Sequence, residues 1–241
     1  MKAHGVVVAM PQEQSWTLTI ETNVVVDDAP AHVLAREAAT AELLVIGANR
    51  HGRIAGALLG STAISVIEVA PGPVVVIRAS EHANDVWPEA AGQVVVGVDG
   101  SQPARQAVRF ALAEAALWGV GLMAIHAWTK PPHPGLHTLE ATGWLDWSFL
   151  KRHAADVLAE SLAAARPDFP KVPVTERVVN EQPGAALVDA SAGARLLVVG
   201  SRGRGGLTGL VLGSVSHGVL HQAHCPVAVV RPRSPTEEKQ E

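Results

Sequence analysis

A glycine-rich stretch near the C-terminus contains the residues most able to do chemistry. Residues 198–220, VVGSRGRGGLTGLVLGSVSHGVL, hold seven glycines between two apolar runs. Glycines let backbone N–H groups close around phosphate oxygens, and the free N–H groups at a helix start favour an anion. We expect a helix from GSVS (213–216), with Ser214 and Ser216 as hydroxyl donors and Arg202 and Arg204 as nearby positive charge. The stretch therefore predicts a phosphate-binding loop.

The elements around this loop alternate between strand and helix patterns. VVVGVD (94–99) is a buried-strand pattern and is followed by an amphipathic run with Pro103 at its start. Further runs predict five strands and four helices in all, which indicates an open, doubly wound parallel α/β sheet. Ligands of such sheets bind beyond the carboxyl ends of the strands. Both VDGS (98–101) and GSRG (200–203) are predicted to lie there.

The chain contains an internal repeat. Residues 41–78 align without a gap to 194–231, 153 residues further on, and 16 of the 38 aligned positions are identical. The identities include glycines outside the strands, which apolar patterning alone would not match, so we infer a duplication. We expect an incomplete first domain at 1–78, a linker at 79–93, a complete second domain at 94–231 and a disordered tail at 232–241.

The first copy has no counterpart of the segment that opens the second. We interpret SWTLTIETNVVV (15–26) as its third strand and GVVVAM (5–10) as a remnant of an earlier one. A domain without its first strand and helix exposes a strand edge and one sheet face. A start that lies downstream of the true one and a genuinely short form are both open.

Composition limits the classes of partner. The formal net charge of −4 gives no overall basic field for nucleic acid or an anionic membrane surface. No run of about 18 apolar residues predicts a membrane span. The single cysteine, Cys225, excludes an internal disulfide and fits a cytoplasmic protein. We expect no nucleic-acid and no membrane partner.

The loop spacing separates this chain from two large nucleotide-binding classes. Gly200-x2-Gly203-x9-Gly213-Ser214 is neither the P-loop pattern nor the GxGxxG of dinucleotide-binding folds. It resembles the universal stress protein family, whose nucleotide-binding members carry G-x2-G-x9-G-[S/T] in this place. The resemblance covers 94–231 well, from VVVGVDGS to CPVAVVR, and only the back half of the first copy.

The resemblance implies an ATP site in the second copy, with Mg²⁺ left open. Asp99, Gly100 and Ser101 would meet the adenosine half, and Ala127 would offer backbone contact to the base. The loop and the helix start would hold the phosphates through Gly200, Ser201, Arg202, Gly203, Gly213, Ser214, Val215 and Ser216. In the first copy Arg50 replaces the second motif glycine and the aspartate is missing, so we expect no binding there.

The resemblance also implies association through the last strands. Family members dimerise by pairing these strands, so we expect a homo-oligomer, and PVVVIR (73–78) and PVAVVR (226–231) could also pair within one chain.

Two groups of side chains outside the loop allow more than one interpretation. His217, His221 and His224 lie on one predicted helix beside Cys225, but no further ligand stands at a fixed spacing, and we expect no metal site. His133, His137, Trp144 and Trp147 would cap the pocket or, as we prefer, anchor a surface loop.

No catalytic constellation is visible, because the loop has no lysine and no nucleophile elbow is present. We expect an ATP-binding regulatory protein of the stress response that acts by nucleotide-dependent association. A slow ATPase or phosphotransferase and a nucleotide-free dimerisation module are the alternatives.

Overall fold

A computed structural model describes residues 20–22, 24–25, 29–48, 59–78, 92–130, 147–204 and 212–232. The second copy folds as the alternation predicts, with strands β3 (Val94–Gly97), β4 (Leu122–Trp128), β5 (Val174–Asn180), β6 (Leu196–Gly200) and β7 (Val227–Val230). Its helices are α3 (Gln102–Trp118), α5 (Ser148–Ala163), α6 (Pro183–Ser191) and α7 (Ser214–Gln222), with a 3₁₀ turn at Arg166–Asp168. The predicted five strands and four helices are therefore confirmed in the described part of this copy.

The first copy contributes α1 (Pro30–Glu37), a 3₁₀ turn (Ala38–Thr40), β1 (Leu44–Ala48), α2 (Ser61–Val69) and β2 (Val74–Arg78). A shift of 153 residues places Pro30 on Pro183, Ser61 on Ser214 and Val74 on Val227, each the first residue of an element. The two copies thus share their element boundaries as well as their sequence pattern.

All strands join one seven-stranded sheet in the order β1-β2-β7-β6-β3-β4-β5. The pairs within each copy are parallel. Between the copies β2 pairs antiparallel with β7, with Val75 opposite Ala228. The expected pairing of the two last strands within one chain is therefore confirmed. It also corrects the expectation of a homo-oligomer through these strands, because β2 and β7 both have neighbours on each side.

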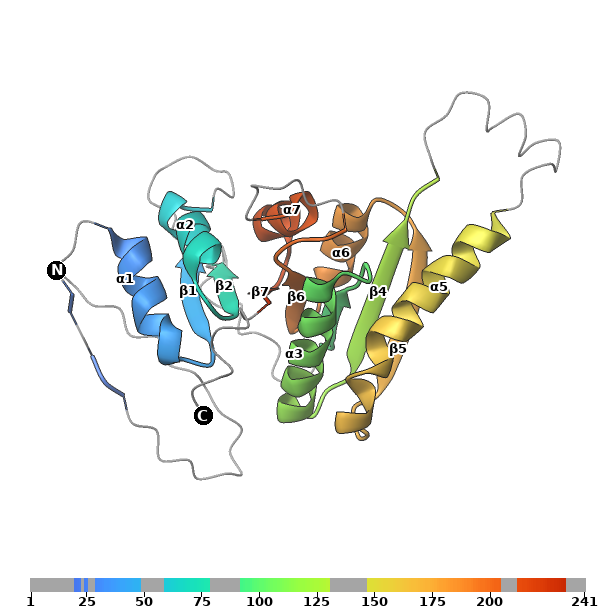
Figure 1. Cartoon of the computed structure of the whole chain (residues 1–241), viewed down its shortest axis with the longest axis horizontal. Coiled ribbons are helices and arrows are strands. Elements are labelled where there is room, and N and C mark those ends of the chain that lie inside the picture. The colour runs from blue at the N-terminus through green and yellow to red at the C-terminus, as the bar shows by residue number, and fades with distance from the viewer. Residues whose placement is uncertain are drawn as a thin grey trace.

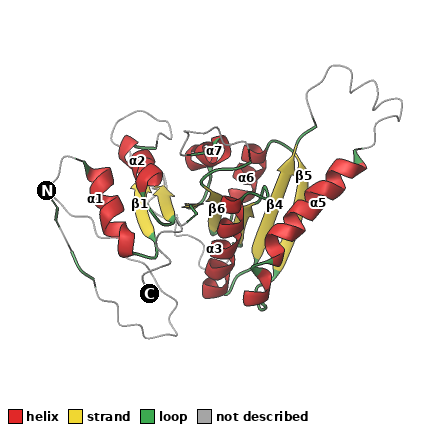
Figure 2. Cartoon of the chain, viewed as in Figure 1, coloured by secondary structure: helices red, strands yellow, loops and turns green. Residues whose placement is uncertain are grey.

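Helices cover the two faces of the sheet unequally (Figures 1 and 2). Alternate residues of a strand point to opposite faces, and Val94 and Val96 pack in a cluster with α3 and α5, while Val95 packs with α6, α7 and α2. Residues of α1 join the second cluster. The first copy therefore brings helices to one face only, among the described residues.

Among the described residues of the first copy there is no counterpart of β3 and α3, and β1 shows the consequence. This strand pairs only with β2 in the described sheet, and Val45, which points away from α1 and α2, is 47% exposed. Within the described residues, β1 therefore has the free edge and the uncovered face that the sequence predicts. No helix of the described residues is long and apolar enough to cross a membrane.

The expected third strand of the first copy is wrong where the structure describes it. Residues 20–22 and 24–25 belong to no strand, and Ile20, Val24 and Val25 are exposed. In the second copy β5 pairs only with β4. The first copy shows no described counterpart of β4, so this apolar segment has no neighbour to complete a sheet. GVVVAM lies outside the described residues.

Candidate functional site

Two loops meet where the direction of winding changes. β3 lies between β4 and β6, and the chain leaves β3 for α3 on one face but leaves β6 toward α7 on the other. The residues after these strands, 98–101 and 201–204, therefore leave the same sheet edge toward opposite faces, and such a switch point is the ligand crevice of open α/β sheets. The predicted meeting of VDGS and GSRG at this edge agrees with the structure.

Asp99 holds the two loops together. One carboxylate oxygen accepts the backbone N–H of Ser101 at 3.0 Å, and the other accepts the backbone N–H of Arg204 at 2.9 Å. Ser101 adds a second link, since its hydroxyl oxygen lies 3.5 Å from the carbonyl of Arg202. Arg204 is exposed and Asp99 is half-buried, so the carboxylate is accessible to solvent at this sheet edge.

Two of the site glycines are required by the fold itself. Gly100 has φ of +80°, a conformation that only glycine adopts readily, and the Arg204 guanidinium lies where its Cβ would be. At Gly200 a Cβ would lie 2.9 Å from the backbone of Pro103, because β6 passes closely under the start of α3. Neither glycine needs a ligand to explain it.

Gly213 is different. It is the N-cap of α7 with ordinary extended dihedral angles, and a Cβ there would lie 3.5 Å from the Cα of Arg202, a normal contact distance. Among the described residues, none would clash with an alanine at this position. A glycine that the packing does not require is what a ligand lying against the backbone would need.

The first turn of α7 has no side-chain cap. Gly213 donates its own N–H to the carbonyl of Ser201 at 2.8 Å, but no side chain of the described residues accepts from the turn that follows. In α3, by contrast, the Ser101 hydroxyl accepts the N–H of Ala104 at 3.3 Å. Ser214 is exposed at this start and Val215 is half-buried. The N–H groups of residues 214–216 are therefore open to an anion.

Ser216 corrects the sequence expectation in part. Its side chain is buried and its hydroxyl donates to the carbonyl of Gly200 at 2.6 Å. This proton is used inside the protein, so Ser216 fixes α7 on β6 instead of offering a hydroxyl to phosphate. Ser201 is also buried, and its backbone N–H and carbonyl are both used in hydrogen bonds, to Val230 and from Gly213.

Ala127 lies where a base could contact backbone. Pairing of β3 with β4 ends at Gly97 and Ile125, whereas pairing of β4 with β5 continues to Trp128 and Asn180. Ala127 thus extends past the end of β3. Its neighbour His126, which the sequence analysis missed, places Nδ1 2.7 Å from the Val98 carbonyl. A carbonyl only accepts, so Nδ1 carries the proton; a histidine inside a buried strand was the available signal.

Several predicted residues fall outside the described part. These are the loop interior 205–211, the long connection 131–146 with His133, His137 and Trp144, and Arg50 of the first copy. Trp147 is described, and its ring lies 5.3 Å from the Lys130 ammonium nitrogen.

The histidines of α7 form no large ligand cluster. The rings of His217 and His221 have centroids 4.6 Å apart, and no group of three or more potential ligands that could hold a metal occurs among the described residues. Burial raises the pKa of the Cys225 thiol to about 12, so it stays protonated at neutral pH.

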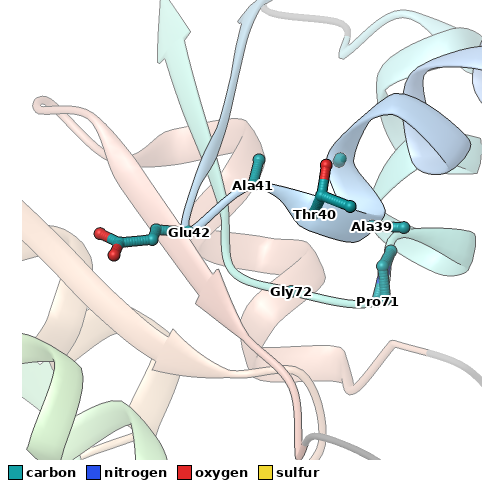
Figure 3. Close-up of a pocket in the computed structure, with 7 residues that line it drawn as sticks. Ala39, Thr40, Ala41, Glu42, Pro71 and Gly72 are labelled. Atoms are coloured by element: carbon teal, nitrogen blue, oxygen red, sulfur yellow. The ribbon is translucent and has the colours of Figure 1, made fainter. Parts of the chain in front are cut away.

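A separate hollow lies before the first residues of β1 and β2 (Figure 3). Only Thr40 and Glu42 bring polar side chains to it. None of the predicted nucleotide residues lines it; its walls are Ala38, Ala39, Thr40, Ala41, Glu42, Pro71 and Gly72.

Comparison with known proteins decides the family. The model of the universal stress protein family matches residues 6–78 and 91–231, both copies of the repeat. The chain belongs to the universal stress protein family. The two matched segments agree with a tandem form, as the repeat predicts.

Curated relatives support this assignment. This universal stress protein is 44% identical over 191 residues to a universal stress protein of Mycobacterium tuberculosis strain H37Rv. The alignment covers 79% of this chain and 62% of the relative. One from Mycolicibacterium smegmatis is 37% identical over 221 residues, covering 90% of this chain and 70% of the relative. The chain spans about three fifths of the length of the first of these.

A solved universal stress protein from Pseudomonas aeruginosa covers 86% of this chain with a TM-score of 0.59 and 19% identity, while 69% of that structure is covered. At this identity the comparison supports the fold alone. The expected doubly wound α/β fold is confirmed for this universal stress protein.

Proposed function

We propose that this universal stress protein binds ATP in its second copy and regulates by nucleotide-dependent association, without rapid turnover. The observation that carries the proposal is Gly213. It begins a helix whose first turn has no side-chain cap, and the packing does not demand a glycine there. A triphosphate placed against this backbone would satisfy the open N–H groups.

We expect a nucleotide to lie along this sheet edge. The phosphates would lie at residues 213–216 beside Arg202, and the ribose would lie near Asp99, whose carboxylate oxygens have lone pairs beyond the two N–H bonds. The base would reach the backbone of Ala127 past the end of β3. Asp99 would then connect the two loops and also contact the ribose.

Titration calorimetry tests the proposal with a matched pair of variants. Gly213→Ala should weaken ATP binding at least tenfold because a methyl group occupies the phosphate position, and its melting temperature without ligand should stay within a few degrees of wild type. Gly60→Ala is the control, since Gly60 is the equivalent N-cap of α2 and has open space at its Cβ. It should bind ATP as the wild type does, with one nucleotide per chain.

Clear results would overturn the proposal. Absence of ATP binding by the wild type, with and without Mg²⁺, or equal affinity of Gly213→Ala, would remove it. Light scattering with and without ATP tests the association. A molecular mass that ATP does not change would overturn nucleotide-dependent association, even if ATP binds. Multiple-turnover phosphate release would favour the slow ATPase alternative.

A further inference from the structure

Arg231 lies at the edge of the phosphate loop. It directly follows β7, and the Ser201 N–H donates to the carbonyl of Val230 at 2.8 Å, which brings the two chain segments together. Val229 packs with α2 and α7, and Val230 packs on the opposite face. By alternation Arg231 points to the face that carries α7, at the sheet edge where α7 begins.

The first copy holds this arginine in place. The Arg231 guanidinium Nη1 lies 3.4 Å from the carbonyl of Ala70, the residue that ends α2. Burial lowers the pKa of Arg231, the positive charge of Arg202 lowers it further, and Glu68 of α2 opposes both. Arg231 therefore lies within electrostatic range of Arg202 from the loop and Glu68 from the other copy.

The two arginines repel each other, and Glu68 and the Ala70 carbonyl offset part of this repulsion. The ion pairs found among the described residues are Arg36–Glu37, Arg109–Asp168 and Arg166–Glu176, all elsewhere. Like charges brought together at a partly buried position are stabilised when an anion binds between them. The start of α7 on the same face adds partial positive charge of its own.

We propose that Arg231, positioned by α2 of the first copy, is a second arginine of the phosphate site and selects nucleotides with terminal phosphates. This inference rests on the proposed function. It gives the first copy a role in ligand selectivity, because the Ala70 carbonyl directs a side chain that belongs to the second copy. Arg202 and Arg231 would contact the phosphates farthest from the ribose.

Calorimetry with ATP and adenosine monophosphate tests the inference on the full chain. Arg231→Gln should raise the Kd for ATP about ten- to hundredfold, the value of a lost hydrogen bond between charged groups. The Kd for adenosine monophosphate should change less than about threefold, since that ligand has no terminal phosphates. Arg78→Gln is the charge-matched control, because Arg78 is the repeat equivalent of Arg231 and ends β2, antiparallel to β7. It should leave both values unchanged.

The outcomes separate this inference from the function beneath it. If the wild type binds no ATP, the proposed function fails first. If the wild type binds ATP and Arg231→Gln binds it equally well, or loses both ligands to the same extent, only the selectivity inference fails. Should Arg231→Gln not fold, Arg231→Lys keeps the charge without the forked geometry of the guanidinium. A weaker affinity for ATP with an unchanged affinity for adenosine monophosphate would support the inference, and an ATP affinity equal to wild type would overturn it.

Discussion

Asp99 joins two loops by hydrogen bonds, in addition to the ribose contact that we propose for it, and these bonds set its sensitivity to mutation. Its two oxygens accept the N–H groups of Ser101 and Arg204, one from each loop of the crevice. Hydrogen bonds to a charged acceptor are stronger than neutral ones. The Asp99 carboxylate therefore holds the two loops together in the absence of a ligand.

Asp99→Asn should destabilise the protein by about 1–3 kcal/mol, because the amide carries no charge and its NH₂ group would face a backbone N–H. Urea unfolding followed by circular dichroism measures this change. Asp168→Asn is the comparison, since the Arg109–Asp168 ion pair of 2.6 Å is exposed on both sides and should contribute under about 1 kcal/mol. Equal effects of the two substitutions would show that Asp99 does not join the loops.

At the scale of elements, two helices begin at the same sheet edge in different ways. α3 has Ser101 as a bonded N-cap, whereas α7 starts at Gly213 with no side-chain cap. An unfilled helix start costs stability unless water or a ligand meets its N–H groups. The capped start of α3 is structural, whereas the uncapped start of α7 is the position where we propose that the phosphates bind.

Two serine substitutions separate these roles. Ser101→Ala should lower stability by about 0.5–2 kcal/mol, the usual value of a lost N-cap. Ser214→Ala should leave stability within about 0.5 kcal/mol, because Ser214 is exposed, but should weaken ATP binding severalfold through loss of a hydroxyl donor. Thermal unfolding with and without ATP records both. A large stability loss in Ser214→Ala, or an unchanged ATP shift, would contradict this division.

At the scale of the molecule, the first copy completes the sheet of the second. Three residues of β2 pair with β7, and Val74 and Val76 pack in the cluster that also contains Val227 and Val229. The edge of β7 is thereby covered from within the chain. Any association between chains must use another surface, and β1 is the described strand on this side with a free edge.

Removal of residues 1–78 should turn the second copy into a dimer. It frees the β7 edge, and a second fragment can supply its own β7 in the place of β2, since the two strands are repeat equivalents that pair antiparallel. Light scattering of the fragment should give twice its chain mass. A monomeric, folded fragment would show that the β7 edge needs no partner.

The sequence determined the fold of the second copy, the duplication and the meeting of two loops at one edge. Alternating apolar runs, glycine spacing and the 153-residue repeat are local properties, and backbone geometry converts them directly into strands, helix starts and a switch point. Pairing of the last strands within one chain was one of two possibilities that the family resemblance left open, and the structure shows that this pairing is antiparallel.

Tertiary structure decided which of the matching residues are free to bind. Ser216 and Gly213 look equally suited to phosphate in the sequence, yet packing uses the hydroxyl of one and leaves room at the other. The apolar segment at 20–25 resembles a strand, but a strand forms only beside a partner, and none is described there. The contact of Arg231 with the Ala70 carbonyl likewise exists only because α2, from a distant part of the chain, lies beside β7. Contacts between residues far apart in sequence settle such questions, and local patterns do not encode them.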